Sequence, residues 1–590
     1  MNLRFLNLSK SYKGKAVFEN ISGQINEGDS IGLIGSNGVG KTTLARLLAG
    51  LEACDQGRVE YSPANIKVLY IEQYPVFDKG ITVYQEVRRA VSDGAQGSAD
   101  NGAVVEKTLN RVGLEKDKWQ QKAQDLSGGE KTKLLLCRIM TCDFDLLILD
   151  EPTNHLDMDS CGWLEDFVRG IKKPMLVISH DRYLLDNTVN RIWELTSGEI
   201  REYEGNYSAY RVQRETELKN ITKEYDKQQN KIRHLKQVIY ERKSWYDSAH
   251  KSAGQNDFYR SKAKKHAGVL KSKKKELERI EDEKIGKPQR TVSPAFEVIN
   301  KAITGSKLPP FLVKGENISK AFGKKTVFRE VSFNIRRRDK VALIGQNGAG
   351  KTTLLRMLCG MDSKYSGTVA VSPSVKVGYF AQEFDNLSSD NSILDELMTA
   401  GAGMQDARLL LAGLLFRGDD VYKKISDLSM GEKGRVAFAK LILSGANLLI
   451  LDEPTNYMDI GSKERIENAL DEFGGSIIFV THDRYFIKRL ANRIFVMEGK
   501  TLHCYDGGYE YYLSKLKEQR LRDRVGADCK RLEDNIRRLE CQLAFISGKL
   551  DEVEDGDEKQ KLHQKFLDTA REINKSREYL KGQDGSGSET

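Results

Sequence analysis

The chain has 590 residues, which is more than one hydrophobic core usually serves, since single cores rarely grow beyond about 250–300 residues. Hydrophobic residues make up 39% of the chain and charged residues 30%, a composition that excludes a globally disordered protein. The net charge is +9, and no apolar run approaches the roughly 20 residues that a membrane-spanning helix requires.

The beginning of the chain lacks the basic-then-apolar layout of a signal peptide. Eight cysteines are scattered along the sequence without a CxxC pair, which predicts neither a disulfide framework nor a zinc site. We therefore expect a cytoplasmic protein.

Four motifs occur twice, in the same order. The glycine-rich run at 35–43 recurs at 345–353, and the three later motifs recur at a constant offset of 302 residues. A repeat of this length indicates a duplicated domain and not a solenoid. We expect the first domain at 1–203 and the second at 301–515. The three later motifs are Leu126–Glu130 with Leu428–Glu432, Leu147–Asn154 with Leu449–Asn456, and Ser179–Tyr183 with Thr481–Tyr485.

Both glycine-rich runs match the P-loop pattern G-x-x-x-x-G-K-[ST], and each lies between an apolar strand signal and an apolar helix. Glycines allow backbone N–H groups to face phosphate oxygens, and the helix N-terminus adds a favourable dipole. One such run alone is also compatible with a glycine-rich turn carrying a surface lysine, but two copies in this context favour ATP binding. The expected nucleotide-binding residues are Gly35, Ser36, Asn37, Gly38, Val39, Gly40, Lys41, Thr42, Thr43, Gly345, Gln346, Asn347, Gly348, Ala349, Gly350, Lys351, Thr352 and Thr353.

Within these runs, two residue types have particular roles. Lys41 and Lys351 are expected to neutralise the β- and γ-phosphates, and the hydroxyls of Thr42 and Thr352 are expected to bind Mg²⁺.

Two apolar strands end in paired carboxylates, Asp150-Glu151 and Asp452-Glu453. The aspartate of each pair suits a contact to Mg²⁺. The glutamate points elsewhere because side chains alternate along a strand, so it is suited to orient and activate the attacking water. A strand capped by solvated acids explains one such pair equally well.

His180 and His482 each follow an apolar strand at the same offset from the acidic pair. A lone histidine at a strand end is more often structural, but the recurrence favours a catalytic contact to the γ-phosphate.

The segment between the repeats, 204–300, carries the excess positive charge. Residues 211–290 contain 23 lysines and arginines against 12 acidic residues, a net charge of +11, so the rest of the chain sums to −2. Apolar residues from Leu218 to Ile239 follow a 3-4 spacing, and a lysine-rich stretch begins near Tyr259. We expect two antiparallel helices of about 30 residues, or roughly 45 Å, joined by a tip at 244–258.

This charge asymmetry predicts a polyanionic partner. Lysines of the return helix are suited to pair with phosphates, and aromatic side chains beside the tip are suited to stack on RNA bases. A solvated coiled coil with capping aromatics is the competing interpretation. The expected RNA-contact residues are Trp245, Tyr246, Phe258, Tyr259, Lys262, Lys264 and Lys265.

The last segment, 516–590, has apolar residues spaced by four and three from Leu532 to Leu550. A break at Asp551–Asp557 precedes a second helical pattern. We expect a C-terminal coiled-coil hairpin with a disordered Gly-Ser tail.

The order of P-loop, Leu-Ser-Gly-Gly signature, acidic strand and histidine resembles ATP-binding-cassette domains. The resemblance implies an α/β fold with two nucleotide-binding domains and ATPase activity. It implies that each signature completes the ATP site of the other domain: Ser127 and Gly129 that of Lys351, and Ser429 and Gly431 that of Lys41. By the same resemblance, Gln73 and Gln382 are Q-loop residues near the metal, Tyr12 and Phe322 stack on adenine, and Asp157 and Asp459 form the D-loops.

The two copies are not identical. Met430 replaces the first signature glycine, and Tyr457-Met458 stands where the first copy has His155-Leu156. These differences predict that the two ATP sites hydrolyse at different rates.

Two cassettes joined by a basic hairpin, without a membrane domain, resemble the ABC-F family of translation factors over residues 1–515. The Asp-Glu-Pro-Thr-Asn-His-Leu-Asp run at 150–157 is typical of that family. Its linkers enter the ribosomal E site and contact tRNA and the peptidyl-transferase region. The resemblance therefore implies a 70S ribosome partner, with contacts to 23S rRNA and P-site tRNA. It also implies a monomer whose cassettes pair within the chain, with no DNA, membrane or transmembrane-subunit partner.

Within the family, the run Ser244–Lys251 and the C-terminal hairpin resemble the subgroup that protects ribosomes from antibiotics. A housekeeping factor that rescues or regulates stalled ribosomes is the alternative. An ATPase subunit of a membrane transporter leaves the basic hairpin unexplained, and an excision-repair ATPase is expected to carry zinc-binding cysteine pairs. A structural coiled-coil protein has no need of two hydrolytic sites.

Overall fold

The computed structural model describes residues 1–73, 77–94, 101–153, 156–252, 257–283, 308–381, 387–401, 403–416, 418–552 and 556–584. The chain divides into two compact units, Met1–Cys504 and Tyr505–Thr590. Among the described residues, none of the helices combines the length and the apolar character needed to cross a bilayer.

The first cassette contains two sheets. Three antiparallel strands form the smaller one, in the order β2-β1-β4: β1 (Asn2–Tyr12), β2 (Lys15–Asn26) and β4 (Gln56–Ser62). The larger sheet has the order β5-β6-β7-β3-β8-β9, in which only the β8–β9 pair is antiparallel. Its strands are β3 (Ser30–Ile34), β5 (Val68–Ile71), β6 (Leu146–Asp150), β7 (Met175–Ile178), β8 (Arg191–Leu195) and β9 (Ile200–Glu204).

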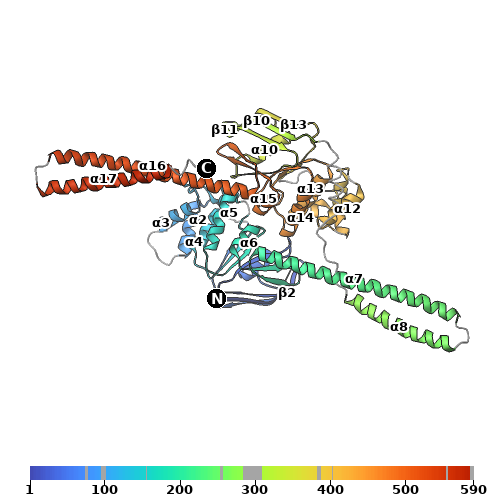
Figure 1. Ribbon diagram of the computed structural model, residues 1–590. Coiled ribbons are helices and arrows are strands. Elements are labelled where there is room, and N and C mark those ends of the chain that lie inside the picture. The colour runs from blue at the N-terminus through green and yellow to red at the C-terminus, as the bar shows by residue number, and fades with distance from the viewer. Residues whose placement is uncertain are drawn as a thin grey trace. The chain divides into compact units, whose positions relative to one another are not determined.

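The helices of the first cassette are α1 (Lys41–Leu48), α2 (Val83–Gly94), α3 (Asn101–Arg111), α4 (Gly128–Thr141), α5 (Met158–Arg169) and α6 (Arg182–Thr188) (Figure 1). Three of them directly follow strands whose ends carry motifs, since α1 follows β3, α5 follows β6 and α6 follows β7.

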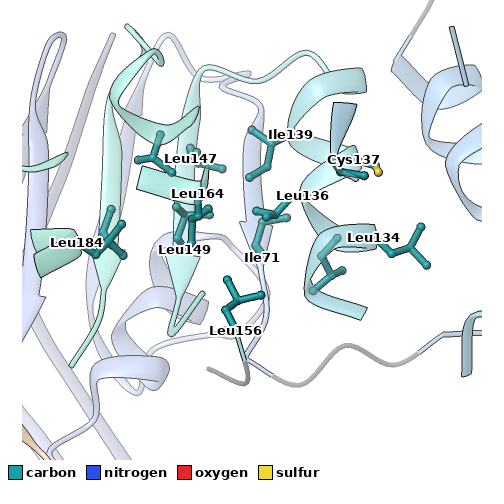
Figure 2. Close-up of a cluster of buried hydrophobic side chains, with 14 of the residues drawn as sticks. Ile71, Leu134, Leu136, Cys137, Ile139, Leu147, Leu149, Leu156, Leu164 and Leu184 are labelled. Atoms are coloured by element: carbon teal, nitrogen blue, oxygen red, sulfur yellow. The ribbon is translucent and has the colours of Figure 1, made fainter. Parts of the chain in front are cut away.

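Strand β6 shows why an unbroken apolar run forms a central parallel strand. Every residue of β6 is buried, as expected for a parallel sheet covered on both faces. Leu147 and Leu149 belong to one core with α4 and α5, which Figure 2 shows, whereas Leu146 and Ile148 face a second core beneath the smaller sheet. Asp150 ends the strand where both cores end, so its carboxylate emerges at the carboxyl edge of the sheet.

The second cassette repeats this plan, which confirms the predicted α/β fold with two cassettes. Its smaller sheet has the order β11-β10-β13 and its larger sheet the order β14-β15-β16-β12-β17-β18. The strands are β10 (Phe311–Phe322), β11 (Lys325–Arg336), β12 (Lys340–Gly345), β13 (Ser366–Val371), β14 (Val377–Phe380), β15 (Leu448–Asp452), β16 (Ser476–Val480), β17 (Arg493–Glu498) and β18 (Thr501–Tyr505). The helices are α10 (Lys351–Leu358), α11 (Ile393–Met398), α12 (Met404–Gly413), α13 (Met430–Leu443), α14 (Ile460–Glu472) and α15 (Arg484–Leu490).

The linker contains the expected pair of helices, α7 (Tyr207–Ser252) and α8 (Asp257–Asp282), which lie side by side (Figure 1). One expectation was wrong: α7 continues to Ser252, so residues 244–252 are helical and not part of a loop. Neither glycine nor proline occurs in that stretch, so nothing in its backbone chemistry ends the helix. With 46 residues, α7 spans about 69 Å at ~1.5 Å per residue, which is longer than the predicted helix.

The second unit contains α16 (Tyr509–Glu552) and α17 (Asp557–Asp584), which also lie side by side. Ile536, Leu539 and Ile573 form its small buried core, and Arg577 Nη2 donates to Glu540 Oε1 at 2.5 Å. The break predicted at 551–557 overlaps the end of α16 and the start of α17. The Gly-Ser tail lies outside the described residues.

Candidate active site

Each P-loop holds its lysine against its own backbone carbonyls. Lys41 Nζ donates to the carbonyls of Gly35 and Ser36 at 2.9 and 3.2 Å. In the second cassette Lys351 donates to Gly345 and Gln346 at 2.7 and 3.0 Å. Burial lowers the pKa of both ammonium groups. Nearby carboxylates raise the pKa, but by less than burial lowers it. Both lysines are thus positioned beneath the loop, where phosphate oxygens would offer the opposite charge.

Glycine is required where each loop meets its helix. Gly40 and Gly350 have φ values of 101° and 102°, in the left-handed region that favours glycine. A Cβ on Gly40 would lie 2.5 Å from Val17 Cγ1, and one on Gly350 2.4 Å from Val327 Cγ1.

The expected P-loop residues fall into two groups. Most of them line one cavity, whereas others support the loop from behind. Gly35, Ser36, Gly345 and Gln346 hold the lysines, and Val39 and Ala349 pack against the cores. The lining residues are Asn37, Gly38, Gly40, Lys41, Thr42, Thr43, Asn347, Gly348, Gly350, Lys351, Thr352 and Thr353.

The aspartates at the ends of β6 and β15 are buried and keep unsatisfied oxygens. Asp150 Oδ2 accepts a hydrogen bond from Tyr70 at 3.1 Å, but Asp150 Oδ1 and Asp452 Oδ2 have no hydrogen-bond partner among the described residues. Burial raises the pKa of each carboxyl group, and a hydrogen bond from Thr42 or Thr352 opposes the shift. A hydroxyl beside an orphaned carboxylate oxygen is a donor set that suits Mg²⁺.

The glutamates that follow have a constrained backbone. Glu151 and Glu453 adopt φ values of 48° and 50°, a left-handed conformation that is costly for residues other than glycine and clusters at functional sites. Glu151 Oε2 accepts from the His180 backbone N–H at 3.2 Å. Burial raises the pKa of both glutamates to about 7. A carboxyl group with such a pKa is suited to accept a proton from water near neutral pH.

Each histidine lies beside the glutamate of its own cassette. His180 Nε2 lies 3.5 Å from Glu151 Oε1, and His482 Nε2 lies 3.3 Å from Glu453 Oε1. Burial lowers the pKa of His180 well below its usual value and that of His482 to about 4. Both rings are therefore neutral at pH 7, so neither contact is an ion pair.

The two cassettes face each other head to tail across a cavity of about 1240 Å³ that both of them line. Asn37 of the first P-loop donates from its backbone N–H to Asp459 Oδ2 at 3.1 Å and from Nδ2 to the Tyr457 carbonyl at 2.8 Å. A Cβ on Gly431 would lie 3.1 Å from Asn37 Nδ2. From the first cassette to the second, the negative charge of Asp157 raises the pKa of Lys351. The first P-loop thus contacts Tyr457 and Asp459 of the second cassette, and Asp157 of the first cassette lies close enough to Lys351 to affect its pKa.

The signature serines begin helices that point into this cavity. Ser127 caps α4 together with Glu130, and Ser429 caps α13 together with Glu432, each in a reciprocal capping box. Ser127, Gly129, Ser429 and Gly431 all line the cavity.

The aromatic and glutamine residues assigned by resemblance are only partly placed. Tyr12 and Phe322 line the cavity with 46% and 58% of their surfaces exposed. The ammonium groups of Lys10 and Lys320 lie 5.4 and 4.8 Å from the centroids of these two rings. Gln73 lines the cavity as well. Gln382 and His155 lie outside the described residues.

The expected RNA-contact residues lie on the linker helices and not in this cavity. Trp245 on α7 and Lys265 on α8 are exposed. The side chains of the others lie outside the described part of the chain; these residues are Tyr246, Phe258, Tyr259, Lys262 and Lys264.

Sequence reasoning missed two ion pairs that join the cassettes, one of them buried and the other partly buried. Arg182 Nη1 donates to Glu467 Oε2 at 3.1 Å, and Arg484 Nη1 donates to Glu165 Oε1 at 2.9 Å. The two pairs are equivalent by the 302-residue repeat offset, and this recurrence was the only signal available in the sequence.

The comparisons agree with this geometry. Residues 18–154 and 328–456 match the ABC transporter family, and residues 193–298 match a second family with the same description. The chain is 32% identical over 561 residues to ABC transporter F family member 5 of Arabidopsis thaliana, covering 88% of this chain and 78% of that one. It is 34% identical over 497 residues to the ribosome protection protein VmlR of Bacillus subtilis (strain 168), covering 82% and 85%.

Among solved structures, the complex of archaeal ribosomal stalk protein aP1 and archaeal ribosome recycling factor aABCE1 contains a chain that superposes with a TM-score of 0.60. The two chains are 19% identical, and the match covers 87% of this chain and 92% of the other. At this identity the likeness concerns the fold alone. With two cassette matches and relatives more than 30% identical over most of their length, the chain is an ATPase of the ABC-F family.

Proposed function

We propose that this ATPase binds the 70S ribosome and that its linker hairpin enters the E site toward the peptidyl-transferase centre, where it protects the ribosome from antibiotics. The observation that carries the proposal is the long, basic hairpin of α7 and α8 between two cassettes. The similarity of this chain to a protein named for ribosome protection also supports the proposal.

The hairpin is a stiff, positively charged rod. Ile232 and Leu235 are buried between its helices, and Lys236 Nζ lies 2.8 Å from Glu281 Oε1 across the pair. Lysines on the outer surface of α8 remain exposed, including Lys271, Lys274 and Lys275. Such a surface suits the phosphates and exposed bases of 23S rRNA and P-site tRNA.

The root of the hairpin is held by both cassettes. Tyr207, the first residue of α7, donates from its hydroxyl to Glu464 Oε1 on α14 at 3.2 Å. The neighbouring Ser208 hydroxyl lies 3.3 Å from the Tyr485 hydroxyl and donates to Asp186 Oδ2 at 2.6 Å. Cassette closure therefore sets the direction of the hairpin. In this proposal ATP-driven closure holds the linker in the ribosome, and hydrolysis releases it.

For hydrolysis, we propose that Glu151 and Glu453 orient the attacking water and accept its proton. Lys41 and Lys351 would bind the β- and γ-phosphates, and the neutral imidazoles of His180 and His482 would contact the γ-phosphate. Mg²⁺, when bound, would neutralise phosphate charge. The residues suited to hold the ion are Thr42, Asp150 and Gln73 in one site and Thr352, Asp452 and Gln382 in the other.

Removal of residues 244–258 tests the proposal in cells. The chain without them is expected to keep its ATPase rate within about twofold, because the described residues 244–252 lie at the end of α7 opposite its root at Tyr207. It is expected to lose protection against every drug that the full chain resists. The measurement is growth of a drug-sensitive bacterium across a panel of ribosome-targeting antibiotics. An equally long deletion at the tip of the C-terminal hairpin, 548–562, is the matched control.

Three results of this experiment contradict the proposal in different ways. If protection survives the deletion, residues 244–258 are not needed for it. A full chain that binds ribosomes but protects against no drug favours a housekeeping translation factor. A chain that neither protects nor sediments with 70S particles, but co-purifies with membranes, favours a transporter subunit.

The salt dependence of ribosome binding should report the lysine contacts. Replacing Lys271, Lys274 and Lys275 by glutamine is expected to reduce the slope of log affinity against log salt by up to about 3, roughly one per lost phosphate contact. Sedimentation over a range of KCl concentrations measures the slope. Glutamine at Lys549, Lys559 and Lys561 of the C-terminal hairpin is the charge-matched control. An unchanged slope in the α8 variant would exclude these lysines from the contact.

A further inference from the structure

The cassettes differ at one buried position of their interface. Asp157 caps α5 and Asp459 caps α14 in the same way, each accepting from the backbone N–H three residues later. The next residue, equivalent by the 302-residue offset, is Cys161 in the first cassette and Lys463 in the second. Both line the cavity between the cassettes.

Lys463 contacts His180 of the first cassette across the interface. Its Nζ donates to the backbone carbonyl of His180 at 3.0 Å. From its own cassette, Asp483 Oδ2 lies 3.4 Å from the same nitrogen, and only 11% of the Lys463 side chain is exposed. Because the ammonium is largely excluded from water, its hydrogen bond to the carbonyl is stronger than an equivalent bond at the surface.

The carbonyl that Lys463 binds belongs to the residue that contacts Glu151. His180 donates from its backbone N–H to Glu151 Oε2 at 3.2 Å, and its Nε2 lies 3.5 Å from Glu151 Oε1. Fixing the His180 peptide therefore fixes two neighbours of the proposed catalytic carboxylate.

At the equivalent position, the first cassette carries a cysteine in place of a basic side chain. Cys161 is packed in the apolar core of its own cassette, and a thiol is short and a weak hydrogen-bond donor. The positive charge of Lys463 lowers the pKa of both Glu151 and Glu453, so its charge alone does not distinguish the two ATP sites. Its hydrogen bond to the His180 carbonyl distinguishes them, because that bond is made at the Glu151 site.

We propose that Lys463 is a positioning residue that acts from the second cassette on the ATP site of Lys41 and Glu151. Its one-sided contact makes that site the faster of the two. This asymmetry is separate from the substitutions at Met430 and Tyr457. The inference rests on the roles proposed above for Glu151 and Glu453.

Variants that keep one glutamate separate the two sites. In the Glu453→Gln chain, the remaining hydrolysis comes from the Glu151 site. There, Lys463→Met is expected to lower kcat about tenfold and to change KM for ATP less than about twofold, because the lost contact acts on the catalytic geometry. Lys463→Arg should restore kcat to within about threefold, since it keeps the charged donor. In the Glu151→Gln chain, Lys463→Met should leave the rate within about twofold.

Cys161→Ala is the matched control at the equivalent position, and it should alter neither background by more than about twofold. Equal losses in both single-glutamate chains would overturn the proposal, as would no loss in the Glu453→Gln chain. A general folding defect would instead lower both rates and would not be rescued by arginine.

Hydrogen–deuterium exchange provides a readout independent of turnover. In ATP-bound Glu151→Gln/Glu453→Gln protein, Lys463→Met should accelerate exchange in 179–183 more than in 481–485. Equal protection of both segments would contradict the proposed contact. If the double glutamine variant still hydrolysed ATP, the roles of the glutamates would fail, and the exchange result would still decide the role of Lys463.

Discussion

Replacing Glu151 and Glu453 together by glutamine is expected to lower ATP hydrolysis by about a hundredfold or more, which is the contribution typical of a general base. Glutamine has nearly the same shape but cannot accept the proton of the attacking water. Only 8% of the Glu151 side chain and 9% of the Glu453 side chain are exposed, so the substitution also removes a largely desolvated charge and should leave nucleotide binding intact. Phosphate release and filter binding of labelled ATP measure the two properties separately.

The same double variant should remain on ribosomes. Because closure no longer ends in hydrolysis, sucrose gradients in ATP should show it co-sedimenting with 70S particles, whereas the unmodified chain dissociates. The control is Glu60→Gln with Glu316→Gln, which changes two exposed glutamates of the smaller sheets, each in a local ion pair. Undiminished phosphate release would remove both catalytic assignments, and free partition away from the ribosome would contradict the proposed partner.

Arg182→Met should have the second-largest effect, on closure of the cassettes. The guanidinium is 3% exposed and contacts Glu467 and Asp483 of the other cassette. Burial alone would raise the pKa of Asp483, but Arg182 and Lys463 outweigh it and lower the pKa to about 2. Removing the arginine leaves buried carboxylates undercompensated, at a cost of about 3–5 kcal/mol. The ATP concentration needed for closure, followed by energy transfer between dyes on the two cassettes, should rise about a hundredfold or more.

The repeat supplies the matched comparison for this variant. Arg484→Met breaks the equivalent pair with Glu165 and should weaken closure in the same direction. Adding Glu467→Met to Arg182→Met should recover part of the loss, because an apolar pair tolerates burial better than an isolated carboxylate. If Arg182→Met closed at the ordinary ATP concentration, the buried pair would not be what holds the cassettes together.

Local chemistry made much of the site predictable. The sequence Leu-Leu-Ile-Leu-Asp-Glu contains both a buried strand and the point where it ends, so Asp150 and Glu151 could be placed at a sheet edge before the structure was known. The lysine and glycines of each P-loop have similarly local reasons. The strained φ of Glu151 was not predictable, because it depends on the neighbouring strand that places His180 beside it.

Contacts between the cassettes could not be predicted in the same way. Arg182 and Glu467 are far apart in sequence, and no helical or strand period relates them. In the sequence, Lys463 is one of several charged residues at 463–467, and only its contact to the His180 carbonyl distinguishes it from them. The linker tip was misjudged for a different reason. The 3-4 spacing of apolar residues ends at Ile239, but the outer part of a helix that leaves the cores needs no apolar stripe, so α7 continues to Ser252.

The length of α7 has a mechanical consequence. A straight helix of 46 residues fixed at Tyr207 acts as a lever whose far end moves much more than its root. With an arm of about 69 Å, a tilt of about 5° displaces the end by about 6 Å, which is a little more than one helical turn. Small rearrangements among Tyr207, Glu464 and Tyr485 are thereby amplified along α7 to a displacement on the scale of a nucleotide at its far end.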